Sequence, residues 1–225
     1  MRPHRPDAGD APRVLLTGFE PFGGERVNPS WEVARALHGE RIAGAAVSAL
    51  CLPCRFGESG EVLARALAQS PVAVVIALGQ ASSRCDMSVE RIAINIDDAP
   101  MPDNAGAQPS DQPAVPGAPA AYFSSLPIKR IVAAMRAEGV PASVSQTAGT
   151  FVCNHLFFRL AHLIATRHPQ LRGGFIHMPM LPEQAAAWTG TACLSLDTMV
   201  RGVRAAVVAT LTGEGAVARD GGTVA

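Results

Sequence analysis

One cysteine stands where a thiol could act as a nucleophile. Cys153 lies in the stretch TAGTFVCNHLFFRLAHL, residues 147–163, where Gly and Thr residues give way to an apolar run of helical period beginning at about Asn154. A helix N-terminus favours negative charge, so a thiol in the first turn can attack as the thiolate. Free cysteines are also among the most buried residue types. The local pattern therefore predicts either a nucleophile or a packing cysteine at a helix start.

A nucleophilic thiol needs a base, and His177 is the histidine best placed to act as one. It closes the strand-like run GGFIH, and the sequence MPMLPEQ that follows changes the chain direction. Ligands and chemistry in open α/β sheets gather at the C-terminal ends of strands. His155 is a poor partner for Cys153, because helical side chains two residues apart do not face each other. His177 is thus the candidate base, and a hydrogen-bonded structural histidine is the alternative.

A carboxylate that orients the imidazole would complete such a site. The acidic residues of suitable type are Glu90, Asp97, Asp98 and Asp197. Glu90 precedes the strand-like run RIAINI, whereas Asp97 and Asp98 follow it. The pattern of residues does not choose among these candidates.

Short apolar runs alternate with amphipathic stretches along the chain. Runs at 13–19, 46–52, 72–79, 91–96, 142–147 and 173–178 predict strands. Stretches at 30–38, 57–69, 127–138, 154–168 and 196–211 predict helices. This alternation is typical of a mostly parallel sheet covered on both faces, so it predicts a three-layer α/β/α fold. The Pro- and Gly-rich segment 97–127 interrupts it and predicts a lid, a binding loop, a subunit contact or a solvated insertion.

Length and charge exclude several classes of function. The chain has 225 residues, 48% of them hydrophobic and 17% charged, which fits one α/β domain, expected at 13–212 between mobile tails at 1–12 and 213–225. Nineteen basic residues balance nineteen acidic ones without a basic cluster among aromatics, so neither nucleic acid nor a membrane is an expected partner. The polar, proline-broken N-terminus does not resemble a signal peptide, which predicts a cytoplasmic protein. A small neutral substrate fits this charge balance.

The chain has five cysteines, and this odd number argues for reduced thiols rather than a disulfide framework. Cys51 and Cys54 form a C-x-x-C pair in a strand-like run, but no second ligand pair follows at zinc-finger spacing. We therefore expect neither a zinc site nor a redox pair there. Cys85 and Cys193 are expected to be packing residues, and no metal or cofactor is expected.

Long ordered blocks of the chain point to a known family. They are VLLTGFEPFGGERVNPSWEVARAL at 14–37, LGQ at 78–80, VERIAINIDDA at 89–99, PDNAG at 102–106, AAYFSSLPIK at 120–129, TAGTFVCNHLF at 147–157 and GFIHMPMLPEQ at 174–184. Together they resemble the pyroglutamyl peptidase I (pyrrolidone-carboxylate peptidase) family of cysteine peptidases. The resemblance implies removal of an N-terminal pyroglutamyl residue from peptides without a cofactor. It also implies a three-layer α/β/α domain related in architecture to nucleoside phosphorylases, and self-association as a dimer or tetramer.

The same resemblance assigns roles to particular residues. It implies that Cys153 is the nucleophile, that His177 is the general base and later the general acid, and that Glu90 orients His177. The implied substrate-binding residues are Phe19, Phe22, Gln80, Phe151 and Val152. A pyroglutamyl group is a flat, uncharged lactam, so a pocket lined by phenylalanines would suit its ring, with polar groups near Gln80 binding its N–H and C=O.

The chain departs from the family pattern at two places. DAPMPDN has Pro100 where the family usually has an arginine thought to assist near the scissile carbonyl, and LGQASSR has Ser82 and Ser83 where glycines are usual. Arg84 and Arg91 are candidate substitutes for the missing guanidinium. A non-catalytic or weakly active relative that binds pyroglutamyl peptides is the alternative to an active enzyme. A nucleoside phosphorylase-like enzyme is the other alternative, on fold analogy alone.

Overall fold

The computed structural model of the protein describes residues 12–213. Its helices and strands, in chain order, are β1 (Arg13–Phe19), α1 (Pro29–Ala36), β2 (Arg41–Ile42), β3 (Ala45–Leu52), α2 (Glu58–Gln69), β4 (Val74–Gln80), β5 (Met87–Glu90), β6 (Ile92–Ile94), β7 (Ala121–Phe123), α3 (Ile128–Ala137), β8 (Ala142–Ser145), α4 (Val152–Thr166), β9 (Arg172–Met178), α5 (Pro182–Ala185) and α6 (Leu196–Leu211). The predicted tails at 1–12 and 213–225 lie outside the described residues, apart from Pro12 and Gly213.

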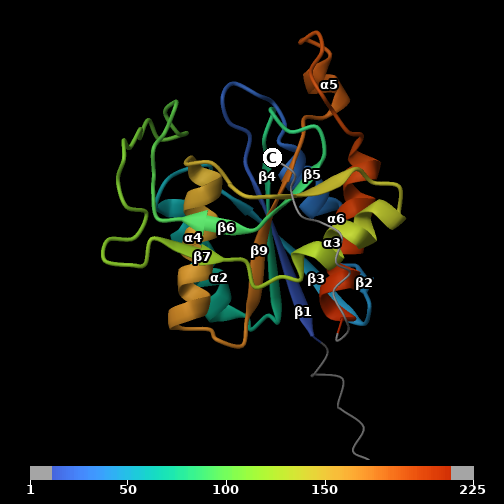
Figure 1. Ribbon diagram of the computed structural model, residues 1–225, viewed down its shortest axis with the longest axis horizontal. Helices are drawn as coiled ribbons and strands as arrows, with labels where there is room; N and C mark the ends of the chain where they lie inside the picture. The colour runs from blue at the N-terminus through green and yellow to red at the C-terminus, as the bar shows by residue number, and fades with distance from the viewer. Residues whose placement is uncertain (1–11, 214–225) are drawn as a thin grey trace, which may run out of the picture.

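A seven-stranded sheet in the order β2-β3-β1-β4-β9-β5-β8 forms the middle layer. Strands β3, β1, β4 and β9 are parallel, whereas β2 pairs antiparallel with β3 and β5 pairs antiparallel with β9. Helices α2 and α4 lie on one side of the sheet, and α1, α3 and α6 lie on the other (Figure 1). The predicted three-layer α/β/α arrangement with a mostly parallel sheet is therefore confirmed.

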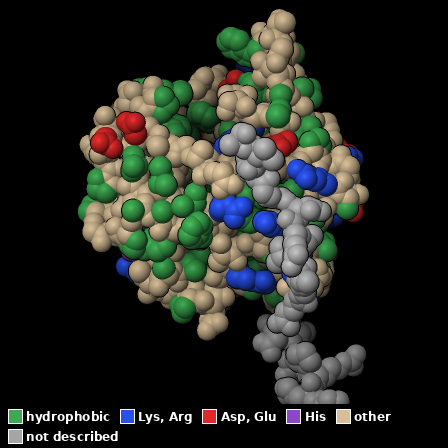
Figure 2. Space-filling view, viewed as in Figure 1, with side chains coloured by type: hydrophobic (Ala, Val, Ile, Leu, Met, Phe, Trp, Pro, Cys, Tyr) green, Lys and Arg blue, Asp and Glu red, His purple; other side chains and the backbone are tan. Residues whose placement is uncertain are grey.

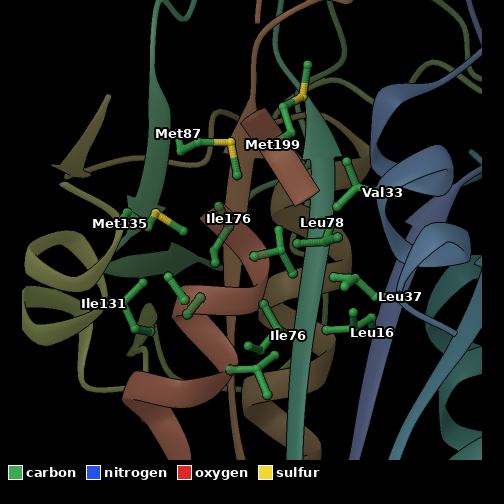
Figure 3. Packing of buried hydrophobic residues seen from close by; sticks show 14 of the residues in the cluster. Leu16, Val33, Leu37, Ile76, Leu78, Met87, Ile131, Met135, Ile176 and Met199 are labelled. Carbon is green, nitrogen blue, oxygen red and sulfur yellow. The ribbon is translucent and has the colours of Figure 1, made fainter. Parts of the chain in front are cut away.

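Strand β4 shows why the sheet is buried on both faces. All seven of its residues are buried, and successive side chains point to opposite faces. Ile76 and Leu78 belong to the core beneath α1, α3 and α6, where Figure 3 shows them among side chains of the neighbouring elements. Val75 and Ala77 belong to the second core, which α4 covers with Phe157 and other apolar side chains. The two cores hold the carboxyl ends of the parallel strands at one edge.

The run at 91–96, predicted as a strand of the main sheet, takes a different place. The main sheet instead contains β5, and the chain leaves it after Glu90, so that β6 pairs with β7 in a separate two-stranded sheet. The buried side chain of Asn154 on α4 accepts a hydrogen bond from the N–H of Ile94 at 3.0 Å and donates to the carbonyls of Ile94 and Ile96 at 2.9 and 3.0 Å. An amide side chain thus satisfies backbone groups that a neighbouring strand would otherwise pair.

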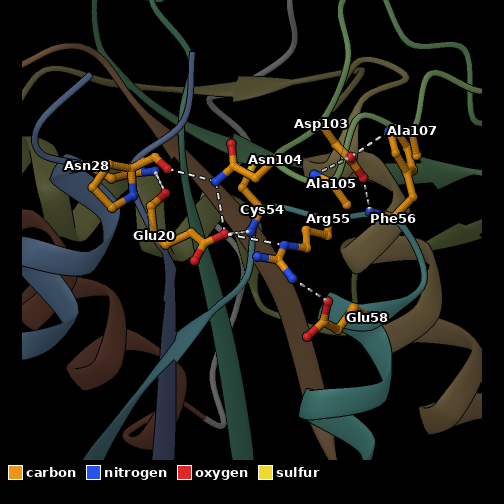
Figure 4. A network of polar contacts seen from close by, with 11 residues as sticks. Glu20, Asn28, Cys54, Arg55, Phe56, Glu58, Asp103, Asn104, Ala105 and Ala107 are labelled. Carbon is orange, nitrogen blue, oxygen red and sulfur yellow. Dashed lines mark hydrogen bonds and ion pairs between the residues drawn. The ribbon is translucent and has the colours of Figure 1, made fainter. Parts of the chain in front are cut away.

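The segment 97–127 is anchored at several points and contains β7, which the sequence pattern did not predict. Asp97 and Gln112 exchange backbone hydrogen bonds of 2.7 and 3.0 Å, which closes the first part of the segment into a loop. Asp103 accepts hydrogen bonds from the N–H groups of Ala105, Ala107 and Phe56 (Figure 4). The loop is therefore fastened to the chain that follows β3. The short elements β2 and α5 were not predicted either.

The surface agrees with the even charge balance of the sequence. The face shown in Figure 2 carries acidic and basic side chains among hydrophobic and uncharged ones. No helix among residues 12–213 has the length and apolar character needed to span a bilayer.

Candidate active site

Cys153 is the second residue of α4, in the first helical turn as predicted from the sequence. The turn before it is shaped by Gly149, which has a φ of 75°, and by the hydroxyl of Thr147, which accepts a hydrogen bond from the N–H of Gly149 at 3.0 Å. Phe151 is the N-cap residue and offers no side-chain acceptor to the helix. The first N–H groups of α4 therefore have no side-chain cap, which is a feature of helix starts that bind anions.

His177 and Glu90 come from neighbouring strands and form a buried hydrogen-bonded pair. Strand β5 runs antiparallel to β9, and Ser88 on β5 lies opposite His177 on β9. Glu90 is two residues further along β5, at its last position. Nδ1 of His177 lies 2.8 Å from Oε1 of Glu90, whose side chain is fully buried. A carboxylate accepts, so Nδ1 carries the proton and Nε2 is left as the basic nitrogen. Of the four candidate carboxylates, Glu90 is the one that contacts His177.

Gly79 brings the thiol and the imidazole to the same end of the sheet. On β4, Gly79 pairs in register with His177 on β9, so both residues face the same side of the sheet. A Cβ atom at Gly79 would lie 2.9 Å from Sγ of Cys153 and 2.6 Å from Cζ of Phe175. The ring of Phe175 in turn packs against the His177 ring with centroids 4.8 Å apart. The missing side chain at Gly79 is what leaves room for the sulfur beside this strand.

Arg84 connects Glu90 to the turn that precedes α4. Its Nη2 lies 3.4 Å from Oε1 of Glu90, and it donates to Oγ of Ser145 at 2.9 Å and to the carbonyl of Thr147 at 2.8 Å. A cation beside a fully buried carboxylate offsets the desolvation cost of its charge. Sequence reasoning considered Arg84 only as a substitute for the missing family arginine, so this contact with Glu90 was missed.

Cys153 and His177 open into a cavity of about 340 Å³. Its lining includes Phe19, Phe22, Gln80 and Phe151 among the expected pocket residues, and also Asn28, Cys54, Ser82, Ser83, Arg84, Pro100 and Met101. Phe151 packs against Phe22 with ring centroids 6.2 Å apart and edge-on against Phe56 at 5.5 Å. The cavity therefore has an aromatic wall, and the segment 97–127 contributes to it through residues 100 and 101.

The cavity wall lacks one residue that was expected in it and includes one that was not. Val152 does not line the cavity, because its side chain is fully buried in the core between α4 and the sheet. Cys54, which was considered with Cys51 as part of a strand, does line the cavity although its side chain is buried. Local pattern gives no sign of this, since Cys54 lies after the end of β3 and reaches the wall only through the folding of the loop.

The protonation of the two cavity thiols follows from their burial. Burial raises the pKa of the Cys153 thiol well above its usual value, and the nearby Cys54 and Glu90 act in the same direction. Desolvation therefore opposes the effect that the helix N-terminus has on this thiol. Burial, then the carboxylates of Glu20 and Asp103, raise the pKa of Cys54 to about 12. A base beside Cys153 that accepts its proton would counter this effect of burial, and His177 lines the same cavity.

The other candidates have structural partners elsewhere. His155 Nδ1 lies 2.7 Å from Oδ2 of Asp97, and His155 Nε2 accepts from the N–H of Gly57 at 3.0 Å, so this pair joins α4 to the start of α2. Asp98 bonds to Thr150 through its backbone, and Asp197 forms an ion pair with Arg201 on α6.

The remaining cysteines, Cys51, Cys85 and Cys193, are exposed. No group of three or more metal-ligating side chains occurs within residues 12–213.

The loop that carries Pro100 is held in place by a polar network (Figure 4). Oε1 of Glu20 accepts from the N–H of Cys54 at 3.1 Å and from Nδ2 of Asn104 at 2.9 Å. Asn28 donates to the carbonyl of Glu20 at 3.0 Å and accepts from Ser30. The network ties the loop after β1, the end of β3 and the segment 97–127 together around one side of the cavity.

Comparisons with known proteins show which family the chain resembles. The family model described as pyroglutamyl peptidase matches residues 12–213. The pyrrolidone-carboxylate peptidase of Cupriavidus pinatubonensis is 59% identical over 210 residues, which cover 93% of this chain and 97% of the relative. That of Streptomyces coelicolor is 57% identical over 197 residues, with coverages of 88% and 91%.

A solved structure shows the same likeness in three dimensions. The crystal structure of pyroglutamyl peptidase I from Bacillus amyloliquefaciens is 46% identical, has a TM-score of 0.87, and is matched over 89% of this chain and 95% of that one. Both the sequence and the fold are thus shared along nearly the whole described chain. The chain belongs to the pyroglutamyl peptidase family.

Proposed function

We propose that the protein is a cysteine peptidase that removes an N-terminal pyroglutamyl residue from peptides, with Cys153 as nucleophile, His177 as base and Glu90 as the residue that orients it. The 2.8 Å contact between Nδ1 of His177 and Oε1 of Glu90 carries the assignment, because it leaves Nε2 to take the thiol proton. Family membership supports the reaction class, since the relatives are named pyrrolidone-carboxylate peptidases.

The reaction proceeds in two halves. Sγ of Cys153 attacks the carbonyl carbon that joins the lactam to the next residue, while its proton passes to Nε2 of His177. The resulting imidazolium is stabilised by Glu90, and it then protonates the departing amine as the C–N bond breaks. Water, losing a proton to the same nitrogen, hydrolyses the thioester. The proton finally returns to the sulfur and pyroglutamate is released.

The start of α4 can stabilise the negative oxygen that forms during each attack. Its first-turn N–H groups have no side-chain cap, and they lie beside Cys153 at the positive end of the helix dipole. Burial of the thiol acts in the opposite direction and raises its pKa. We assign these N–H groups a role in stabilising the transition state.

The cavity wall supports the proposed selection of a lactam. Phe22 and Phe151 offer flat apolar surfaces to a neutral five-membered ring, and the nearly buried Gln80 supplies polar groups at the same wall. A prolyl residue brings a charged secondary amine and lacks the ring carbonyl, and a glutamyl residue brings two charges. An apolar wall of this kind cannot solvate the charges of either residue.

Hydrolysis of pyroglutamyl, prolyl and glutamyl aminomethylcoumarin amides tests the proposal, with Cys153→Ala as the control for catalysis by this site. We expect kcat/KM for the pyroglutamyl amide to exceed the other two by at least ~10³, because sites that hydrogen-bond a substrate group can reject analogues lacking it by ~10⁴. Comparable values for the pyroglutamyl and prolyl amides would refute a lactam-reading pocket. Unchanged activity in Cys153→Ala would refute the assigned nucleophile.

A further inference from the structure

A second hollow adjoins the catalytic cavity. It has a volume of about 380 Å³ and shares Phe22, Gln80, Ser82 and Met101 with that cavity. The rest of its lining comes from Gly23, Glu25, Met180, Trp188 and Thr191. We call this hollow the distal groove. Gly23 and Glu25 belong to the loop that follows β1, and Met180, Trp188 and Thr191 flank α5. This loop and α5 stand at the upper edge of the view in Figure 1.

We propose that the distal groove binds the residue that follows pyroglutamate in the substrate, and that it favours an aromatic or large apolar side chain over an acidic one. This inference rests on the proposed function, because that function places the lactam in the catalytic cavity. With the lactam there and its carbonyl at Cys153, the departing chain must leave through the rim of the cavity. The four shared residues make the distal groove continuous with that rim.

The apolar surface in the groove is unusually exposed. The side chain of Trp188 is 63% exposed and that of Met101 is 38% exposed, and both belong to the small set of large hydrophobic residues that the described chain leaves in contact with solvent. Phe22 is half-buried between the two hollows. A substrate side chain with an aromatic or branched apolar surface would cover these groups and gain from their removal from water.

The charge in the groove disfavours acidic residues. Glu25 is the ionisable side chain in its lining, and no Lys or Arg occurs among the described residues that line it. Oε2 of Glu25 accepts a hydrogen bond from Nε2 of Gln184 at 3.2 Å, which holds the carboxylate beside the groove. An aspartate in the substrate would therefore face a like charge without a cationic partner.

Three synthetic dipeptide amides test the inference: pyroglutamyl-Phe-NH₂, pyroglutamyl-Ala-NH₂ and pyroglutamyl-Asp-NH₂, with the released amino-acid amide quantified by chromatography. The parent protein should cleave the Phe substrate with a kcat/KM at least about 10-fold above the Asp substrate. Trp188→Ala should lower kcat/KM for the Phe substrate about 3- to 10-fold, with little change for the Ala substrate. Glu25→Gln should raise kcat/KM for the Asp substrate roughly 2- to 5-fold.

Phe123→Ala is the matched control, because Phe123 is 70% exposed on β7 and lines neither hollow. It should leave all three values as in the parent. Equal kcat/KM for the three amides in the parent would overturn the inference. An equal loss of kcat/KM for all three amides in Trp188→Ala would also overturn the inference. If that loss came with a changed elution volume in size-exclusion chromatography, Trp188 would be assigned to a subunit contact. Failure to cleave any of the amides would instead contradict the proposed function.

Discussion

Adding one methyl group at Gly79 should displace the proposed catalytic thiol while leaving the protein folded. In Gly79→Ala the new Cβ would lie 2.6 and 2.8 Å from ring atoms of Phe175 and 2.9 Å from Sγ of Cys153. Optimal contacts between carbon atoms are about 3.5 to 4.0 Å, so these distances are too short by roughly 0.6 to 1.4 Å. Phe175 is fully buried and packs against His177, so it has little room to move. The displacement must fall largely on the sulfur or on the imidazole.

Two magnitudes follow from this geometry. Inserting a methyl group into a packed core costs about 1 to 3 kcal/mol in the free energy of unfolding. Misplacing a reacting group by about 1 Å can cost about 100-fold in rate. We therefore expect Gly79→Ala to remain folded, with a lower Tm and a kcat/KM for pyroglutamyl-aminomethylcoumarin reduced about 100-fold.

Gly173→Ala provides the matched control for overpacking. Gly173 lies on β9, and a Cβ there would meet Cδ1 of Ile164 at 2.9 Å and Cδ2 of Leu160 at 3.1 Å, away from the cavity. This variant should lose stability while keeping its kcat/KM. Thermal melts and initial rates of both variants measure the two effects. Full activity in Gly79→Ala, or an equal loss of activity in Gly173→Ala, would refute the reasoning that Gly79 makes room for the nucleophile.

Three further predictions concern the cavity. Alkylation by iodoacetamide should inactivate the protein in step with labelling of Cys153, mapped by mass spectrometry; inactivation that follows labelling of the exposed Cys51 or Cys85 instead would contradict the assigned nucleophile. Pro100→Arg should raise kcat/KM, by up to ~10²- to 10³-fold if the guanidinium acts as an oxyanion donor, and an unchanged value would mean that another group already serves this role. Since the pKa of Cys54 is raised from 9.0 to about 12, the folded chain keeps a proton that the unfolded chain releases above pH 9. This group should therefore lower the free energy of unfolding by about 1.4 kcal/mol per pH unit as the pH rises from 9 toward 12. Urea titrations at neutral pH and at about pH 10.5 should show a smaller fall in Cys54→Ala than in the parent protein. An equal fall in both proteins would count against the raised pKa.

Local sequence determined the helices and strands that carry the chemistry. The change from a Gly- and Thr-rich turn to a helical period placed Cys153 in a first helical turn, and the short run GGFIH placed His177 near the end of a strand. Both are patterns of neighbouring residues, and the regular periods of helices and strands allow such patterns to be recognised in a sequence. The family resemblance then selected Glu90 among the four carboxylates. The residue pattern alone had left that choice open.

Tertiary structure decided what depends on residues far apart in the chain. Glu90 and His177 are separated by 87 positions and meet because β5 lies antiparallel beside β9, in a strand that the pattern had placed a few residues later. Strand pairing of this kind is non-local, so no short window encodes it. The same holds for the ion pair of Arg84 with Glu90 and for Cys54 in the cavity wall.

The protonation state of Cys153 is the clearest case of this division. Sequence alone indicated a helix N-terminus, whose dipole favours the thiolate. Burial of the sulfur against β4 and the nearby Glu90 favour the neutral thiol, and both arise only when the helix packs on the sheet. Burial raises the pKa of this thiol, so the tertiary structure acts on its protonation in a direction that the local pattern does not indicate.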